Sequence, residues 1–203
     1  MKIMKNKKNI NLCKVLSGIF LFLSLLLIIN NYYEDYKARN MSNEIIDEIE
    51  KELSMISLKD IEDKDLTGIA MPKMRIGDYD YIGEISIEKL GIQLPVMDDW
   101  DYEKLKIAPT RYSGSVYDKN LVIAAHNYRS HFGGIHRLNI GDYAKFIDVE
   151  GHLSEFEVVN IEVLDPTHVE KFIYSEKNDW HLTLFTCTLG GTERTTVRFK
   201  QIY

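Results

Sequence analysis

The sequence predicts a mainly β fold, a closed or nearly closed β-barrel that follows an N-terminal helical region. Between residues 79 and 203, short apolar or alternating segments recur, about seven or eight in all, and they are typical of barrel strands. Clear helical patterns lie before residue 58. The length of 203 residues suits one folded domain with an appendage.

The composition is that of a globular protein, but the charge is unevenly distributed. Hydrophobic residues make up 45% and charged residues 28%, which excludes intrinsic disorder and a polytopic membrane protein for the whole chain. Residues 1–14 contain five lysines and no acid. Removing these from the 25 Lys and Arg leaves 20 basic against 31 acidic residues. Such an acidic body lacks the electrostatic footprint of a nucleic-acid-binding protein, so we expect no nucleic-acid partner.

The N-terminal region predicts a membrane anchor. Residues 15–29 form a run of 15 residues without a charge. Its flanks lengthen the run to the roughly 20 residues that a bilayer needs, and Tyr32 and Tyr33 suit the headgroup region. We therefore predict a transmembrane signal anchor over residues 15–33. A cleaved signal peptide and a buried core helix are the alternatives, although no small-x-small cleavage site follows the run.

The basic flank predicts the orientation of this anchor. By the positive-inside rule, the basic tail of residues 1–14 stays in the cytoplasm. The rest of the chain then lies outside the cell, which makes the protein a single-pass protein of the cell membrane.

Residues 34–78 are predicted to form a juxtamembrane helix and a linker. Apolar residues at steps of three or four predict a helix whose stripe packs on the domain or, alternatively, lines a free stalk. The segment after Ser57 is charged and rich in turn residues, and it contains Pro72. We therefore place the start of the barrel domain at Tyr79 and its extent at residues 79–203. The stripe consists of Ile45, Ile46, Ile49, Leu53 and Ile56.

The strands of the barrel are predicted from period-two alternation and from continuous apolar runs. Tyr81–Ile87 alternates, and residues 120–125 form the apolar run expected of a strand that is buried on both faces. A hairpin that turns at Glu150–Gly151 accounts for residues 144–163. The remaining predicted strands cover residues 92–96, 182–186 and 194–199.

The two cysteines point to a chemical role for Cys187. Cys13 falls in or beside the predicted membrane span, so it does not pair with Cys187 within one chain. Exported proteins tend to pair or eliminate thiols, so a lone external thiol suggests chemistry, with a buried inert cysteine as the alternative. Two cysteines also exclude a disulfide-stapled scaffold and a zinc ribbon.

A histidine and two arginines are candidate partners for this thiol. Cys187 ends a predicted strand, and a thiol needs a nearby base or cation to attack as thiolate. His126 ends another buried strand and is the candidate base, with a structural histidine as the alternative. Arg194 and Arg198 lie four residues apart and therefore on one face of a strand. Either could stabilise an oxyanion or be a solvated barrel arginine, and the periodicity does not distinguish them.

These residues together resemble the sortases, the membrane-anchored cysteine transpeptidases of Gram-positive bacteria. Residues 183–187, Thr-Leu-Phe-Thr-Cys, match the family signature TLxTC, and Ala-His-Asn at residues 125–127 follows an apolar strand. The order of histidine, cysteine and arginine agrees as well. The resemblance covers about residues 79–203 and implies the eight-stranded sortase β-barrel with short helices.

The resemblance also implies roles for individual residues. Cys187 would be the nucleophile, His126 the general acid and base, and Arg194 the arginine that steadies substrate and oxyanion. Three further residues would contact the substrate or shape the site. These are Asn127, Tyr128 and Thr186.

The implied reaction is transpeptidation without a metal or cofactor. The thiolate would cleave the Thr–Gly-type bond of an LPxTG-like sorting signal on a surface protein. An amine of a peptidoglycan precursor, or a pilin lysine, would then resolve the thioacyl enzyme. Residues 70–78 contain no Asp-Pro-aromatic lid motif, which disfavours the pilin-polymerising alternative. The subclass stays open, with a class B-like or class D-like sortase as possibilities.

Three alternatives to the sortase function are a different enzyme class, an inactive binding protein and a zinc site. An L,D-transpeptidase or a cysteine peptidase is the nearest enzymatic alternative, and the TLxTC match argues against both. A catalytically inactive, membrane-tethered binding barrel would make Cys187 dispensable. His126, His131 and His136 are spaced five apart, which does not keep metal ligands on one helical face, and two glycines interrupt the run. We therefore expect no zinc site.

Overall fold

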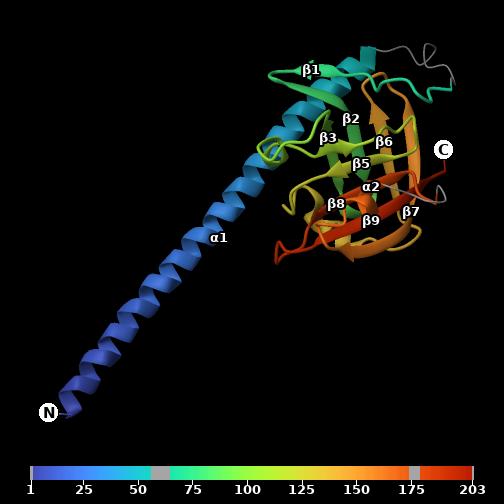
Figure 1. Cartoon of the computed structure of the whole chain (residues 1–203). Coiled ribbons are helices and arrows are strands. Elements are labelled where there is room, and N and C mark those ends of the chain that lie inside the picture. The colour runs from blue at the N-terminus through green and yellow to red at the C-terminus, as the bar shows by residue number, and fades with distance from the viewer. Residues whose placement is uncertain (1, 56–64, 174–178, 203) are drawn as a thin grey trace. The chain divides into compact units, whose positions relative to one another are not determined.

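The computed structural model describes residues 2–55, 65–173 and 179–202, with side chains from residue 12 onward. The chain divides into two units, residues 1–37 and residues 38–203. Helix α1 (Lys2–Met55) makes up the described part of the first unit and continues into the second (Figure 1). The predicted anchor and the predicted juxtamembrane helix are therefore parts of one helix.

The first unit carries the apolar segment. By length and composition, helix α1 is able to cross a membrane, because an 18-residue window near the N-terminus reaches a mean hydropathy of 2.6. None of that window is buried, which does not fit the core-helix alternative. A signal sequence has the same properties, so these features are common to an anchor and a cleaved signal.

The described residues of the second unit form nine strands and several short helical segments. The strands are β1 (Met74–Ile76), β2 (Tyr79–Ile87), β3 (Ile92–Met97), β4 (Thr110–Ser113), β5 (Leu121–Ala124), β6 (Tyr143–Asp148), β7 (Leu153–Leu164), β8 (Leu182–Cys187) and β9 (Arg194–Gln201). The helical segments after α1 are η1 (Glu88–Leu90), η2 (Lys104–Lys106), η3 (Phe132–Arg137) and α2 (Glu170–Ile173).

Eight of these strands close into a barrel, as predicted. Their order around the ring is β2-β3-β4-β5-β8-β9-β7-β6, and the pairing of β6 with β2 closes it. Strand β1 pairs with β2 and lies outside the ring. The pairs β3–β4 and β5–β8 are parallel, whereas the other neighbours are antiparallel.

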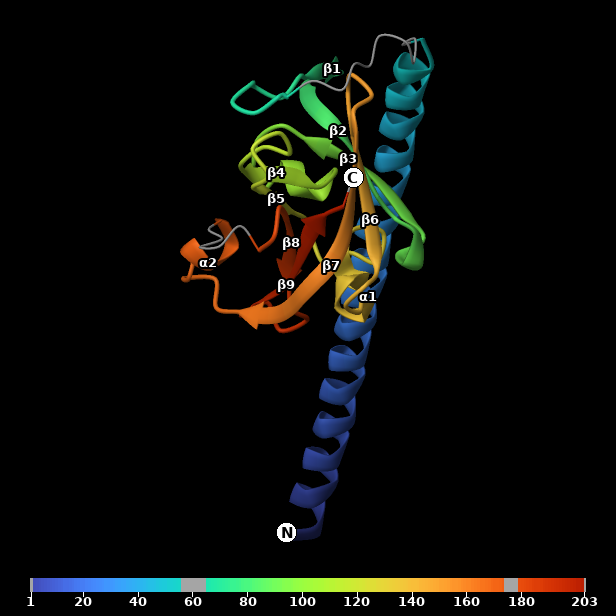
Figure 2. The ribbon, with the colours of Figure 1, turned by 90° about the vertical axis from the view of Figure 1, so that its right-hand side faces the viewer.

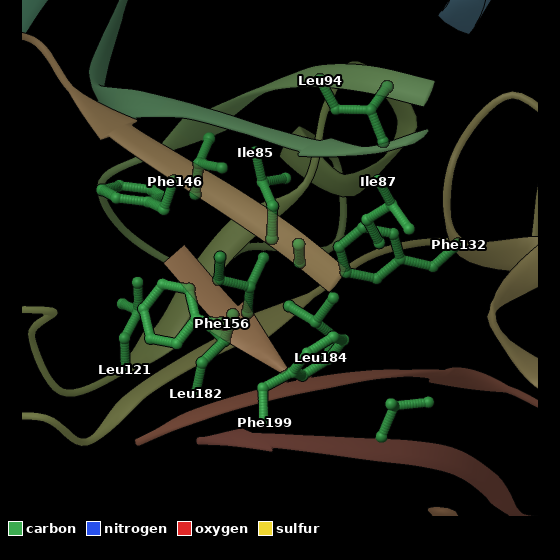
Figure 3. Close-up of a cluster of buried hydrophobic side chains, with 14 of the residues drawn as sticks. Ile85, Ile87, Leu94, Leu121, Phe132, Phe146, Phe156, Leu182, Leu184 and Phe199 are labelled. Atoms are coloured by element: carbon green, nitrogen blue, oxygen red, sulfur yellow. The ribbon is translucent and has the colours of Figure 1, made fainter. Parts of the chain in front are cut away.

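Apolar side chains from around the ring fill the barrel (Figure 3). Phe146 on β6, Phe156 on β7 and Phe199 on β9 are fully buried and meet the isoleucines of β2. Burying one such side chain contributes about 1.5–3 kcal/mol. This core holds the strands that carry the site in a fixed register.

The part of α1 that belongs to the second unit packs on the outside of β2 and β3 (Figure 2). Ile45 and Ile49 form a second apolar cluster with Tyr81, Met97 and Ala108. The predicted apolar stripe is thus buried against the barrel, while its last residue, Ile56, lies outside the described residues.

Two strands were missing from the sequence prediction. Strand β1 falls within the predicted linker, and Met71 just before it is buried in the barrel core. Strand β4 has the sequence Thr-Arg-Tyr-Ser, which lacks an apolar alternation, and a bulge between Arg111 and Ser113 interrupts its pairing with β5. Tertiary pairing rather than local pattern makes it a strand.

The closing contact of the barrel requires a glycine. Gly83 on β2 pairs with Val96 on β3 and with Asp148 on β6. A Cβ at this position would lie 2.1 Å from the backbone oxygen of Ile147, and the residue has a φ of +151°. Any side chain would therefore push β2 and β6 apart.

We expect Gly83→Ala to lower the free energy of unfolding by about 3 kcal/mol, because the added methyl group cannot be accommodated without separating two backbones. Urea denaturation followed by circular dichroism measures this. Gly190→Ala is the matched control, since its Cβ would meet its nearest neighbour at 3.7 Å. An equal effect of the two substitutions would contradict the close approach.

Candidate active site

The parallel pairing of β5 and β8 brings His126 beside Cys187. The register runs one for one from Leu121 with Leu182 to Ala124 with Phe185. Two hydrogen bonds continue this register beyond the strands. The amide of Ala125 donates to the oxygen of Phe185 at 3.2 Å, and Nδ2 of Asn127 donates to the oxygen of Thr188 at 3.5 Å.

The continued register sets the relation between the two reactive side chains. The strand pairs end at Ala124 with Phe185, and extending the register by two residues sets His126 opposite Cys187. Neighbouring strands are about 4.7–4.9 Å apart. By this extrapolation, the imidazole and the thiol, 61 residues apart in sequence, belong to the same face of the barrel wall.

The antiparallel pairing of β8 and β9 adds an arginine on the other side of the thiol. Cys187 pairs directly with Arg194, whereas Arg198 pairs with Thr183 further along the strand. The order across the three strands is therefore His126, Cys187 and Arg194. The half-buried guanidinium of Arg194 donates from Nη1 to the backbone oxygens of Gly191 and Glu193, at 3.2 and 3.1 Å.

Arg198 has a different environment. Its guanidinium is buried, forms an ion pair with Glu162 and donates to Asn160 at 2.8 Å and to the oxygen of Lys171 at 2.7 Å. It also lies over the ring of Trp180, 4.3 Å from the centroid. These contacts tie β9 to β7 and α2. The strand register thus distinguishes the two arginines, because only Arg194 is paired with Cys187.

The predicted site residue Thr186 connects the end of β8, which carries Cys187, to the segment after β5, which carries His126. Its side chain is 3% exposed, and its hydroxyl donates to the backbone oxygen of Ala125 at 2.8 Å. Alternation along β8 puts it on the opposite face from Cys187. This hydrogen bond joins the residue before the nucleophile to the residue before His126.

A cavity of about 360 Å³ is lined by both Cys187 and Thr186. Asn127, His136, Thr195 and the β8–β9 loop also line it. Leu189 in that loop is 99% exposed. Asn127, predicted to contact substrate, thus lies beside Cys187 in this cavity.

Tyr128, also predicted near the substrate, packs against the candidate base. Its ring centroid lies 4.9 Å from that of His126 and 5.6 Å from that of His131. Burial lowers the pKa of His126, and the positive charge of Lys106 lowers it further. The imidazole is therefore neutral at pH 7 and able to accept a proton from a neighbouring thiol.

Aromatic side chains border the thiol on its own face, and sequence reasoning missed them. Phe185, two residues before Cys187 on β8, contacts Tyr112 at 5.3 Å and Phe172 at 4.9 Å between ring centroids. Tyr112 in turn contacts Trp100, which is 40% exposed. Strand alternation could have placed Phe185 beside Cys187, but Tyr112 lies on the strand that the pattern did not predict.

The three evenly spaced histidines do not form a metal centre in the structure. His131 is fully buried next to Ser42 and Tyr128, and His136 is exposed. Within residues whose side chains are described, no three His, Cys, Asp or Glu groups gather so that they could hold a metal ion.

Comparisons with known proteins agree on one family. A family model described as the sortase domain matches residues 85–201. Sortase C1 from Streptococcus suis is similar in structure, with a TM-score of 0.53 and 26% identity over 61% of this chain and 73% of that chain. No curated protein sequence matches the chain.

Two solved structures with lower sequence identity to this chain show the same fold. Sortase C from Streptococcus pneumoniae has a TM-score of 0.62 and 17% identity, covering 79% of this chain and 97% of that one. A sortase D5 transpeptidase from Clostridium perfringens has a TM-score of 0.56 and 21% identity, covering 83% and 99%.

We expect the imidazole of His126 to titrate below pH 6.5 in the folded chain, because burial and Lys106 both disfavour the imidazolium. NMR of histidine-labelled protein measures the midpoint, and His126→Gln assigns the signal. The urea-unfolded chain, with a midpoint near 6.5, is the reference. Since the unfolded state takes up this proton first, the stability from neutral His126 is present above pH 6.5 and declines as the pH falls towards the folded midpoint. A folded midpoint above 6.5 would contradict this environment.

Proposed function

The chain belongs to the sortase family, and from this premise we propose that it is a cysteine transpeptidase acting on surface proteins. Its substrate would be an LPxTG-like sorting signal, and its second substrate an amine of the cell wall. The observation that supports this proposal is the direct pairing of Cys187 with Arg194, together with the β5–β8 register, whose extension by two residues sets His126 opposite Cys187.

The first half of the reaction forms a thioester. Neutral His126 takes the proton of the Cys187 thiol, and the thiolate attacks the carbonyl carbon of the substrate threonine. The carbon–nitrogen bond then breaks, and the imidazolium of His126 returns the proton to the departing amine. The acyl group remains on sulfur.

Arg194 is suited to stabilise the charge that develops in both steps. It pairs directly with Cys187, and the described residues engage only its Nη1, through two loop carbonyls. Its remaining N–H groups are therefore available to the oxyanion of the tetrahedral intermediate. Fixed donors of this kind typically lower an acyl-transfer barrier by about 3–4 kcal/mol.

The second half releases the product as an amide. The acceptor amine gives a proton to His126 and attacks the thioester, after which the carbon–sulfur bond breaks and the thiolate leaves. Water competes with the amine at this stage. The aromatic surface formed by Phe185, Tyr112 and Trp100 disfavours water next to the thioester.

The N-terminal segment would place the enzyme at its substrates. We propose that residues 15–33 anchor the chain in the cell membrane, with the basic tail in the cytoplasm and residues 79–203 outside. Because both reaction partners are attached to the outer face of the membrane, a tether raises their effective concentration without any new contact.

A pilin lysine is the second candidate acceptor. The Streptococcus pneumoniae sortase C structure is described in terms of catalysis and pilin substrate specificity, and the Streptococcus suis relative is a sortase C1. Both acceptors are primary amines, so the chemistry at Cys187 is the same. Competition between a cell-wall cross-bridge peptide and a pilin lysine peptide distinguishes them.

We expect the full chain in detergent micelles to form a thioacyl adduct on Cys187 with at least one sorting-signal peptide. Intact-mass spectrometry after incubation with LPxTG-like and NPxTx-like peptides detects the adduct, and added amines should discharge it to an amide. Cys187→Ala should abolish both products. The inactive binding-barrel alternative predicts instead that no peptide forms an adduct and that Cys187 resists a thiol-reactive probe.

Substitution of Arg194 should affect mainly activity, whereas substitution of Arg198 should affect mainly stability. Arg194→Ala should lower the rate of adduct formation about 10²–10³-fold, because it removes the group paired with the nucleophile, with little change in stability. Arg198→Ala should lower the free energy of unfolding by about 2–4 kcal/mol, because it breaks a buried network. Peptide kinetics and urea denaturation of both variants measure this. The reverse pattern would assign the catalytic role to Arg198.

A further inference from the structure

Helix α1 makes a buried polar contact with the loop that follows β5. Ser42 lies among apolar residues on the packed face of the helix and is 1% exposed. Its hydroxyl donates to the backbone oxygen of Ile107 at 3.2 Å, and its Oγ lies 3.4 Å from Nε2 of His131. Because the hydroxyl donates its hydrogen bond to Ile107, its oxygen is left to accept a hydrogen bond from the Nε2–H tautomer of His131.

Contacts between aromatic rings connect His131 to the candidate base, His126, through Tyr128. His131 is fully buried, and its ring meets Tyr128 at 5.6 Å with 48° between the planes. Tyr128 meets His126 at 4.9 Å with 36° between the planes. A displacement of the His131 ring therefore presses on Tyr128, and Tyr128 forms one wall of the space that His126 occupies.

Backbone hydrogen bonds make this loop a closed turn. The oxygen of Tyr128 accepts the amides of His131 at 3.0 Å and of Gly133 at 2.8 Å. The oxygen of His126 accepts the amide of Phe132 at 3.2 Å. The turn thus moves largely as a unit, so fixing His131 fixes His126 as well.

The other contact of Ser42 is with a second segment near His126. Ile107 directly follows Lys106, whose charge lowers the pKa of His126. Ala108 is fully buried in the same cluster as Ile45 and Ile49 of the helix. One hydroxyl on α1 therefore contacts both His131 and the segment that carries Lys106.

We propose that Ser42 and His131 are positioning residues for His126, so that the docked segment of α1 sets the geometry of the proton transfer with Cys187. The expected effect on kcat rests on the proposed function. The expected effect on the titration midpoint of His126 does not depend on it. Displacing a catalytic group by about 1 Å lowers a rate as much as 10²-fold.

The test compares substitutions on one helix, in the full chain in detergent micelles. Ser42→Ala removes the buried hydroxyl, and Ser42→Thr retains it. Ser54→Ala is the matched control, because the hydroxyl of Ser54 is exposed and bonds to Lys51 within the helix at 2.6 Å. His131→Phe keeps an aromatic ring against Tyr128 but loses the contact with Ser42.

Three quantities are measured for each variant. The first measurement is the kinetics of peptide cleavage, the second is the NMR titration midpoint of His126, and the third is the urea midpoint of unfolding. Ser42→Ala should lower kcat about tenfold with KM within about twofold, and it should move the His126 midpoint upward as the ring becomes more solvated. Ser54→Ala should change neither kcat nor the His126 midpoint. Ser42→Thr should keep kcat within about twofold of the unsubstituted protein.

A double variant tests whether the two residues act together. If they do, Ser42→Ala combined with His131→Phe should lower kcat no further than the more damaging single substitution. Multiplicative losses would overturn the proposal. An unchanged kcat and His126 midpoint in Ser42→Ala and in His131→Phe would overturn it too and leave the contact a purely stabilising one.

The titration also separates this proposal from the proposed function. If no peptide is cleaved by any variant, the transpeptidase function fails, but the His126 midpoint still reports on positioning. A midpoint that moves in Ser42→Ala and not in Ser54→Ala supports the link in that case. A midpoint that stays fixed in both refutes it.

Discussion

The parallel register between β5 and β8 is the constraint on which the site depends. Extended by two residues beyond its last pair, it sets His126 opposite Cys187, and the hydroxyl of Thr186 bonds to the oxygen of Ala125 at the point where the strands end. Shifting one strand by a single residue would turn the imidazole and the thiol to opposite faces. The chemistry therefore depends on backbone pairing before it depends on any side-chain contact.

The closed barrel keeps this register from slipping. Each of the three strands that carry the site has a partner on both sides, and the ring is completed where Gly83 allows β2 and β6 to approach. The β9 pairing positions Arg194 by the same means, while Arg198 anchors β9 to β7 and α2. Two arginines on one strand thus have different environments: Arg194 pairs with Cys187, and Arg198 stabilises the contact of β9 with β7 and α2.

Sequence patterns predicted the elements whose side chains alternate or run apolar, and they placed His126 and Cys187 at the ends of two of these strands. They did not predict β4, because Thr-Arg-Tyr-Ser becomes a strand only through its neighbours. They also could not choose between Arg194 and Arg198, which periodicity places on one face. Contacts such as Ser42 with His131, 89 residues apart, depend on the docking of a helix and leave no local signature.

The sequence distance between the reactive groups also bears on when activity arises. His126 and Cys187 are joined by a parallel pair whose linking hydrogen bond spans 61 residues, and Arg194 lies on the last strand of the chain. Pairings between distant segments form late, because the loop between them must be ordered first. Under the proposed function, the thiol would therefore acquire its base only when the ring is nearly complete, and a partly folded chain would carry an unactivated cysteine.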